Sequence, residues 1–147
     1  VIFAGDHFFA DMARYRFARP ARGDLVIFNS PEKPEVLQIG RAIGLEGEEI
    51  AIRDKDVYIN SRPLTDPWGQ HNDPDTFARL SFNDQWSRRD HLEPQKIPAD
   101  AVFILGDNRD NSMDSRFLGP VPLSSIRGRA LYIYWSADKS RIGTSLR

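Results

Sequence analysis

Short apolar runs recur along the chain, separated by segments rich in Gly, Pro, Asn and Asp. The clearest runs cover residues 25–28, 37–45, 101–105 and 129–136. Runs of this length, bounded by turn residues, are typical of strands, and no segment sustains the period of an amphipathic helix. The pattern therefore predicts an all-β fold of mostly antiparallel sheets with few or no helices.

Two further segments complete this picture. Residues 49–52 and 56–60 are short strand-like runs joined by the polar residues 53–55, which predicts a β-hairpin. Residues 66–95 contain three prolines and no sustained period. A long irregular segment of this kind is typical of an excursion from a sheet. We expect one domain over residues 1–147, with a variable polar insertion at 66–95.

Composition narrows the class of protein. A chain of 147 residues fits one domain with one sizeable core. The net charge of −1 argues against a nucleic-acid partner held by phosphate contacts, and the absence of cysteine excludes disulfides and thiolate chemistry. The longest apolar run, residues 130–135, is far below the ~20 residues that cross a bilayer. Because the chain opens inside an apolar run without Met, we expect its start to lie upstream.

The most polar loop, residues 106–116, directly follows the apolar run 101–105. Ten of its eleven residues are Gly, Asp, Asn, Ser or Arg, which favour turns and local hydrogen bonds. Three Asp and two Arg can brace such a loop by carboxylate–guanidinium pairs. A calcium loop does not fit, because Arg109 would occupy a ligand position and Ser112 the position of the glycine.

Two groups of His and acidic residues raise the question of a metal. Carboxylates next to a histidine in a polar loop are common, and neither spacing matches a metal-ligand template. We therefore expect no metal and no cofactor. The two groups are His71 with Asp73 and Asp75, and His91 with Asp90 and Glu93.

Several stretches together resemble bacterial type I signal peptidases, in the order of that family. Residues 106–116, followed by Gly119-Pro120-Val121-Pro122, resemble its last signature box. The other matching stretches are Gly5-Asp6-His7, Arg22 to Phe28, Gly40 to Glu48, and Arg127 to Ala130. The resemblance implies the catalytic β-domain of these enzymes.

The family uses a serine nucleophile and a lysine general base, a variant of the catalytic triad. A lysine acts as a base near neutral pH only when burial lowers its pKa, which is otherwise about 10.4. In this sequence the lysine maps to Gly40, which has no side chain. Arg41 stays protonated and, by alternation along a strand, points to the other face. The nucleophile box would end just before Val1, so the serine and a membrane anchor are expected upstream.

The resemblance assigns the remaining site residues. Asp107 is expected to pair with Arg41, and Asp114 with Arg116. Ser112 maps to the serine that orients the lysine. Asn108 and Arg109 complete the site scaffold, and an extended peptide would lie along the strand edge formed by Leu37, Gln38 and Ile39.

Two interpretations of activity remain open. In one, the chain is a catalytically silent homologue that binds extended peptides or secreted preproteins on the extracytoplasmic face of the bacterial cytoplasmic membrane, in the periplasm or at the cell surface. In the other, it is an active signal peptidase whose serine lies upstream and whose lysine was mutated or replaced. A self-cleaving repressor peptidase is a third class. The Arg22-Gly23-Asp24 strand entry and the complete 106–116 loop favour leader peptidases instead.

Overall fold

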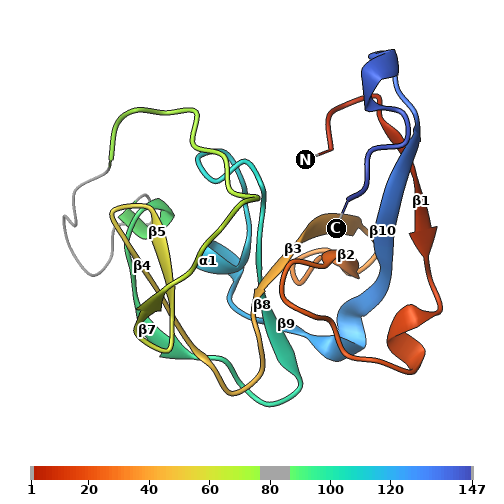
Figure 1. Cartoon of the computed structure of the whole chain (residues 1–147). Helices are drawn as coiled ribbons and strands as arrows, with labels where there is room; N and C mark the ends of the chain where they lie inside the picture. The colour runs from red at the N-terminus through yellow and green to blue at the C-terminus, as the bar shows by residue number, and fades with distance from the viewer. Residues whose placement is uncertain (1, 77–86, 147) are drawn as a thin grey trace.

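The computed structural model describes residues 2–76 and 87–146 (Figure 1). Strands dominate this part of the chain, and its only α-helix is a single turn of four residues. The strands are β1 (His7–Asp11), β2 (Leu25–Asn29), β3 (Leu37–Gly44), β4 (Glu49–Arg53), β5 (Asp56–Ile59), β6 (Arg62–Pro63), β7 (Leu92–Lys96), β8 (Ala101–Leu105), β9 (Val121–Pro122) and β10 (Ile126–Trp135). The helices are η1 (Arg14–Arg16), η2 (Ser87–Arg89), α1 (Ser115–Leu118), η3 (Leu123–Ser125) and η4 (Lys139–Arg141).

The strands form two antiparallel sheets. The larger has the order β1-β10-β2-β3-β8-β9, and the smaller has the order β6-β5-β4-β7. Every pairing within them is antiparallel. The predicted all-β class and the predicted hairpin of β4 and β5 are therefore confirmed.

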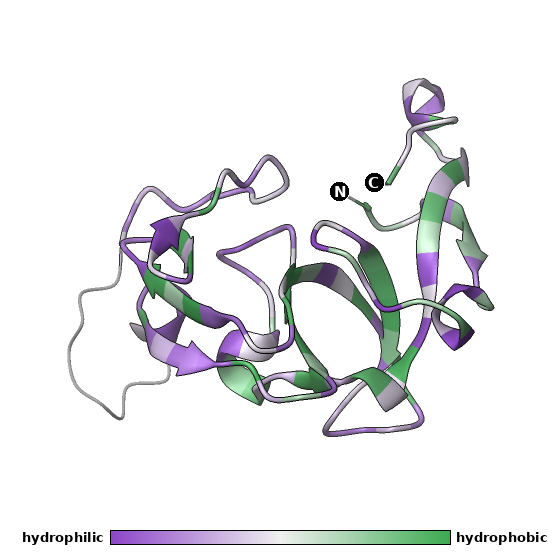
Figure 2. Cartoon of the chain, turned by 60° about the horizontal axis from the view of Figure 1, so that its bottom comes forward, coloured by the Kyte–Doolittle hydropathy of each residue, from purple (hydrophilic) through white to green (hydrophobic). Residues whose placement is uncertain are grey.

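Strands β3 and β8 separate two hydrophobic cores. Ile43, Phe103 and Leu105 face the core shared with the smaller sheet. Ala42 and Ile104 face a second core with β2 and the start of β10. All five residues of β8 are buried, which explains why this run lacks the polar alternation of a half-exposed strand. Figure 2 shows the hydrophobic residues concentrated along these central strands, with hydrophilic residues in the outer loops.

Two boundaries differ from the sequence prediction. Strand β10 begins at Ile126, three residues before the apolar run 129–136, and a register shift lies between Ile126 and Gly128. The buried Ile126 pairs with Phe28, a contact that the sequence of a bulged strand does not reveal. Strand β7 lies almost wholly inside the predicted insertion and pairs with β4. Pro94 has no backbone N–H to donate and is therefore unusual in a strand, but β7 is an edge strand, where proline is tolerated.

Apart from β7 and η2, the predicted insertion is irregular where it is described. Residues 66–76 contain no strand, only an isolated bridge at Gln70. Residues 77–86 lie outside the described residues. No helix within the described ranges is long and apolar enough to cross a membrane.

Candidate functional site

The first half of β3 is paired on one side only. Residues 37–40 pair with β2, whereas β8 joins β3 only from Arg41 onward. The backbone of residues 37–40 is thus an open edge within the described part of the chain. Leu37 and Ile39 expose 55% and 38% of their surface there. Gln38 is half-buried, and its Oε1 has no hydrogen-bond partner among the described residues.

Gly40, at the end of this open edge, is buried against β8. A Cβ atom on Gly40 would lie 2.5 Å from Cγ2 of Ile104 and 3.3 Å from the carbonyl oxygen of Leu105. Both separations are shorter than ordinary carbon contacts of about 3.5–4.0 Å. The methyl group of a β-branched side chain has few alternative rotamers, so it does not easily move aside. Ile104 therefore fills the space in which a side chain at position 40 would begin.

Arg41 points to the opposite face of β3, as alternation predicts. Its Nε and Nη2 donate to the two carboxylate oxygens of Asp107, each at 2.8 Å. Its Nη1 donates to the carbonyl oxygens of Gly23, at 2.7 Å, and Leu146, at 3.2 Å. The guanidinium also lies 5.4 Å from the ring centre of Trp68. Arg41 is 1% exposed, so this predicted pair is a buried structural brace.

The second predicted pair closes the far end of the 106–116 loop. Arg116 donates from Nε and Nη2 to the two carboxylate oxygens of Asp114, at 2.9 and 2.8 Å. The same carboxylate accepts the backbone N–H of Gly106 at 3.0 Å. Arg116 Nη1 reaches the carbonyl of Arg89 at 2.8 Å, so the loop is also tied to η2.

Ser112 lies against the backbone where β8 ends. A Cβ on Gly106 would fall 2.1 Å from Ser112 Oγ, so only glycine lets the serine pack here. Arg41 lies opposite Leu105 in the antiparallel register. Continuing that register by one residue sets Gly106 opposite Gly40. The fold thus places Ser112 and Gly40 at the same end of the β3–β8 pair.

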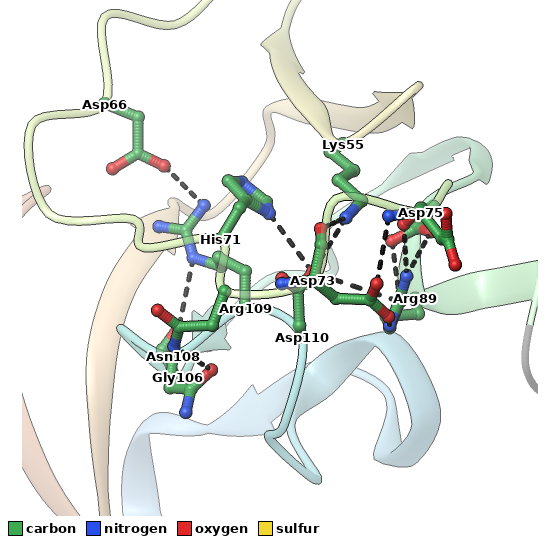
Figure 3. A network of polar contacts seen from close by, with 12 residues as sticks. Lys55, Asp66, His71, Asp73, Asp75, Arg89, Gly106, Asn108, Arg109 and Asp110 are labelled. Carbon is green, nitrogen blue, oxygen red and sulfur yellow. Dashed lines mark hydrogen bonds and ion pairs between the residues drawn. The ribbon is translucent and has the colours of Figure 1, made fainter. Parts of the chain in front are cut away.

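Asn108 and Arg109 hold the segment 66–76 against the loop. Asn108 and Gln70 form a parallel bridge, and the Arg109 N–H donates to the Gln70 carbonyl at 2.9 Å. The Arg109 guanidinium pairs with Asp66 and donates from Nε to the Gly106 carbonyl at 3.0 Å. Part of the predicted insertion is therefore built into the site scaffold (Figure 3).

Asp110 is the centre of a polar network that the sequence analysis did not identify (Figure 3). Its carboxylate lies 3.3 Å from both Lys55 Nζ and His71 Nδ1, accepts the Asp73 N–H at 2.8 Å, and lies 4.0 Å from Arg89 Nε. Burial alone would raise the pKa of Asp110. The Asp73 N–H, His71 and Lys55 outweigh it, and the pKa is held well below its usual range.

Residues of the two His and acidic groups considered in the sequence analysis contact charged neighbours. Arg89 binds Asp90 through two 2.9 Å hydrogen bonds and Asp73 through one of 2.8 Å. His91 lies 3.6 Å from Asp54. No group of three or more His, Asp and Glu suited to a metal ion occurs among residues 2–76 and 87–146.

Comparison with known proteins identifies the family of this site. The family described as "Signal peptidase, peptidase S26" matches residues 2–135. This chain belongs to the signal peptidase family. It is 36% identical over 141 residues to a signal peptidase I of Leptolyngbya laminosa, covering 91% of this chain and 62% of that relative. It is 31% identical over 124 residues to signal peptidase I V of Bacillus subtilis, covering 84% and 72%.

The structural comparison agrees. A solved signal peptidase I from Enterococcus faecalis V583 superposes with a TM-score of 0.58 at 28% identity, covering 76% of this chain and 97% of that one. The thylakoidal processing peptidase 1 of Arabidopsis thaliana is 30% identical over 145 residues, covering 92% of this chain. The chain spans 62% and 38% of the length of the Leptolyngbya and Arabidopsis relatives.

Sequence reasoning missed the residues that act through tertiary contacts. Ile104 reads as one more core residue in an apolar run, and nothing in the sequence shows that it abuts Gly40. Asp66 and Asp110 are separated by 43 residues and carry no mutual spacing signal. The available clue was that Asp110 lies beside Arg109 in the loop of residues 106–116, which we call the signature loop.

Proposed function

We propose that this domain is a catalytically silent member of the signal peptidase family that holds an extended peptide of a secreted protein without cleaving it. The observation that carries the proposal is the contact between Gly40 and Ile104. The resemblance assigns the general base to position 40, and the Cγ2 of Ile104 lies 2.5 Å from where a Cβ there would be. The contact supports the proposal because a lysine at position 40 would have to displace Ile104.

Neighbouring cations do not take over the role of the lysine. Arg41 carries an always-charged guanidinium committed to Asp107. The nearest lysine to the signature loop is Lys55, whose Nζ donates to the Asp73 carbonyl at 2.6 Å and pairs with Asp110. Both cations act as donors in structural networks. In this proposal neither cation supplies the general-base catalysis that typically contributes about 10²–10⁴-fold.

The peptide-binding part of the site is retained. The open edge of residues 37–40 offers backbone groups to an added strand, and main-chain pairing of this kind supplies affinity in many peptide-binding domains. Exposed Leu37 and Ile39 offer apolar contacts beside it. A peptide in extended form, such as the end of a leader sequence, is the ligand that fits this edge.

We also propose a place of action, the extracytoplasmic face of the bacterial cytoplasmic membrane, with an anchor upstream of Val1. Family membership supports an association with a membrane, and one relative, from Arabidopsis thaliana, is named as a mitochondrial inner membrane protease subunit. Accessibility of the domain to added protease in intact spheroplasts tests the assignment.

Binding of a labelled leader-derived peptide, followed by fluorescence anisotropy, tests the retained edge. The substitutions Leu37→Asn and Ile39→Asn remove the apolar contacts and are expected to weaken binding about ten- to a hundredfold together. Full burial of each such side chain contributes about 1.5–3 kcal/mol, and only the exposed 55% of Leu37 and 38% of Ile39 remain for a peptide to bury. Val36→Asn is the matched control, because Val36 is 42% exposed but precedes the strand. If the Leu37→Asn and Ile39→Asn substitutions leave the peptide affinity as high as that of the Val36→Asn control, the edge of residues 37–40 does not bind the peptide.

A further inference from the structure

A second concave surface lies away from the signature loop, between η1 and the start of β10. It is a cavity of about 280 Å³, open to solvent, and five side chains line it: Met12, Tyr15, Arg16, Ile126 and Arg127. Three of these are apolar or aromatic and two are cationic. None of them belongs to the open edge of β3 or to the 106–116 loop.

The floor of this groove is held rigidly. A Cβ on Gly128 would lie 2.7 Å from the sulfur of Met12, so glycine is what lets Met12 pack onto β10. The Tyr15 hydroxyl donates to Asp24 Oδ2 at 2.9 Å, and Asp24 also pairs with Arg129 at 3.1 Å. Burial, together with Asp24, raises the pKa of Tyr15 above its ordinary value, so the ring keeps its neutral, donating hydroxyl. A wall fixed before binding lowers the entropic cost of binding.

The rim of the groove carries positive charge without matching carboxylates. Arg19, Arg22 and Arg129 form ion pairs with acidic residues. Within the described ranges, by contrast, no carboxylate pairs with Arg16 or Arg127. Arg127 donates from Nε to the side-chain oxygen of Asn29, which fixes the guanidinium and leaves its terminal nitrogens to a ligand.

Two neighbours of the rim matter as well. The carboxylate of Asp11 is occupied by the backbone N–H groups of Ala13 and Arg14, both at 3.0 Å. Phe17, directly after η1, is 91% exposed. Arg, Met and aromatic residues are enriched at protein–protein interfaces, and the cavity lining together with Phe17, which follows Arg16 in the chain, has this composition.

We propose that this groove binds an acidic segment of a partner protein, with one aromatic or aliphatic side chain seated between Met12, Tyr15 and Ile126 and flanking carboxylates paired with Arg16 and Arg127. Charge complementarity decides the occupant: the floor is apolar and the rim cationic. The recessed shape favours one inserted side chain of a peptide. A lipid surface would instead require several apolar side chains projecting together, whereas the apolar side chains here line a hollow together with Arg16 and Arg127. The proposal is independent of peptide binding at β3.

Methionine-methyl NMR on residues 1–147 tests this directly, because this sequence contains only two methionines, Met12 and Met113. Met113, 56% exposed in the signature loop, is the internal control. The probe is the peptide acetyl-Asp-Asp-Phe-Asp-Asp-amide, and its counterpart has Asn in place of each Asp. The acidic peptide is expected to shift the Met12 methyl signal to saturation and leave Met113 unmoved, while the neutral peptide binds at least tenfold more weakly.

Two double variants provide a further test. Arg16→Ala combined with Arg127→Ala is expected to lower the affinity for the acidic peptide at least tenfold. Arg53→Ala combined with Arg62→Ala, which removes two exposed arginines of the smaller sheet, is expected to leave that affinity unchanged. An unmoved Met12 signal at millimolar peptide overturns the proposal, as does equal affinity for both peptides. Vesicles of phosphatidylglycerol that shift Met12 where the peptide does not would assign the groove to lipid and also overturn it.

Discussion

At the scale of single residues, the role of Gly40 depends on its contact with Ile104. The sequence shows that position 40 lacks a lysine, but only the structure shows that Ile104 occupies the space beside it. A glycine in a strand normally weakens it, because glycine loses more backbone entropy on folding than other residues. Here the close packing of β3 on β8 depends on that glycine.

A double-mutant cycle measures this packing. Gly40→Ala alone is expected to destabilise the domain by about 1–3 kcal/mol, the usual cost of overpacking a core. In the Ile104→Leu background the cost should fall, because leucine has no methyl at Cγ2 while keeping the volume. Urea unfolding checks this. If Gly40→Ala is neutral or stabilising in the native background, Ile104 does not block the position.

The buried pair of Asp114 and Arg116 gives a second residue-scale prediction. Asp114→Ala leaves a guanidinium that is 2% exposed, and the Gly106 N–H, without their acceptor. Breaking a buried pair from one side costs about 3–5 kcal/mol, so the melting temperature should fall steeply. The control is Glu46→Ala, whose partner Arg19 is 60% exposed. That change should cost less than about 1 kcal/mol. Equal effects of the two substitutions would show that the loop is not braced.

At the scale of elements, the segment 66–76 is fastened to the signature loop. Asp66 pairs with Arg109, and His71 and Asp73 both contact Asp110. Lys55, at the tip of the β4–β5 hairpin, joins the same carboxylate. Three elements distant in sequence are thereby held by one buried acid.

This network should make stability depend on pH in acid. The pKa of Asp110 is depressed in the folded state, so its contribution is fully present above the unfolded value of about 3.9 and is lost as pH falls towards the folded value. Asp110→Asn should therefore cost about 1–3 kcal/mol at pH 7, with a gap to the parent protein that narrows below about pH 4. Urea midpoints at pH 7, 4 and 3 measure the gap, with exposed Asp56→Asn as the control. If the difference in stability between the parent protein and Asp110→Asn does not change with pH, the pKa of Asp110 is not depressed in the folded state.

The strands were predictable wherever a local pattern determines them. The runs at 25–28, 37–45 and 101–105 became β2, β3 and β8 because apolar composition and flanking turns agree with the final packing. Strand β7 was missed because Leu92–Lys96 has a proline and three polar residues, and it pairs only through its contact with β4. Long-range pairing, which decides such edge strands, leaves little trace in a local window.

The site was predictable to the extent that motif residues act on one another. The pairs of Arg41 with Asp107 and Arg116 with Asp114 were expected from the resemblance, and both are present. Asp110 and Asp66 were not expected, because their partners come from a hairpin tip and an irregular segment. The groove beside η1 had no sequence signal beyond a cluster of arginines.

At the scale of the whole molecule, the proposed function assigns peptide binding and catalysis to different features of the fold. The open edge of residues 37–40 depends on the pairing of β3 with β2 and on where β8 joins. The general base is assigned, by resemblance, to the side chain at position 40. Under this proposal the side chain can be lost while the edge remains, and the domain binds peptide without cleaving it.

Hydrolysis of a leader peptide by four forms of the full-length protein, each containing the upstream segment, tests the central claim most directly. The forms are the parent, Gly40→Lys, Ile104→Leu, and the double substitution. We expect the parent to bind the peptide without cleaving it, and Gly40→Lys alone to leave the cleavage rate unchanged. Measurable cleavage is expected only when Gly40→Lys is combined with Ile104→Leu. Rapid cleavage by the parent protein would contradict the account, because it would show that another group serves as the base.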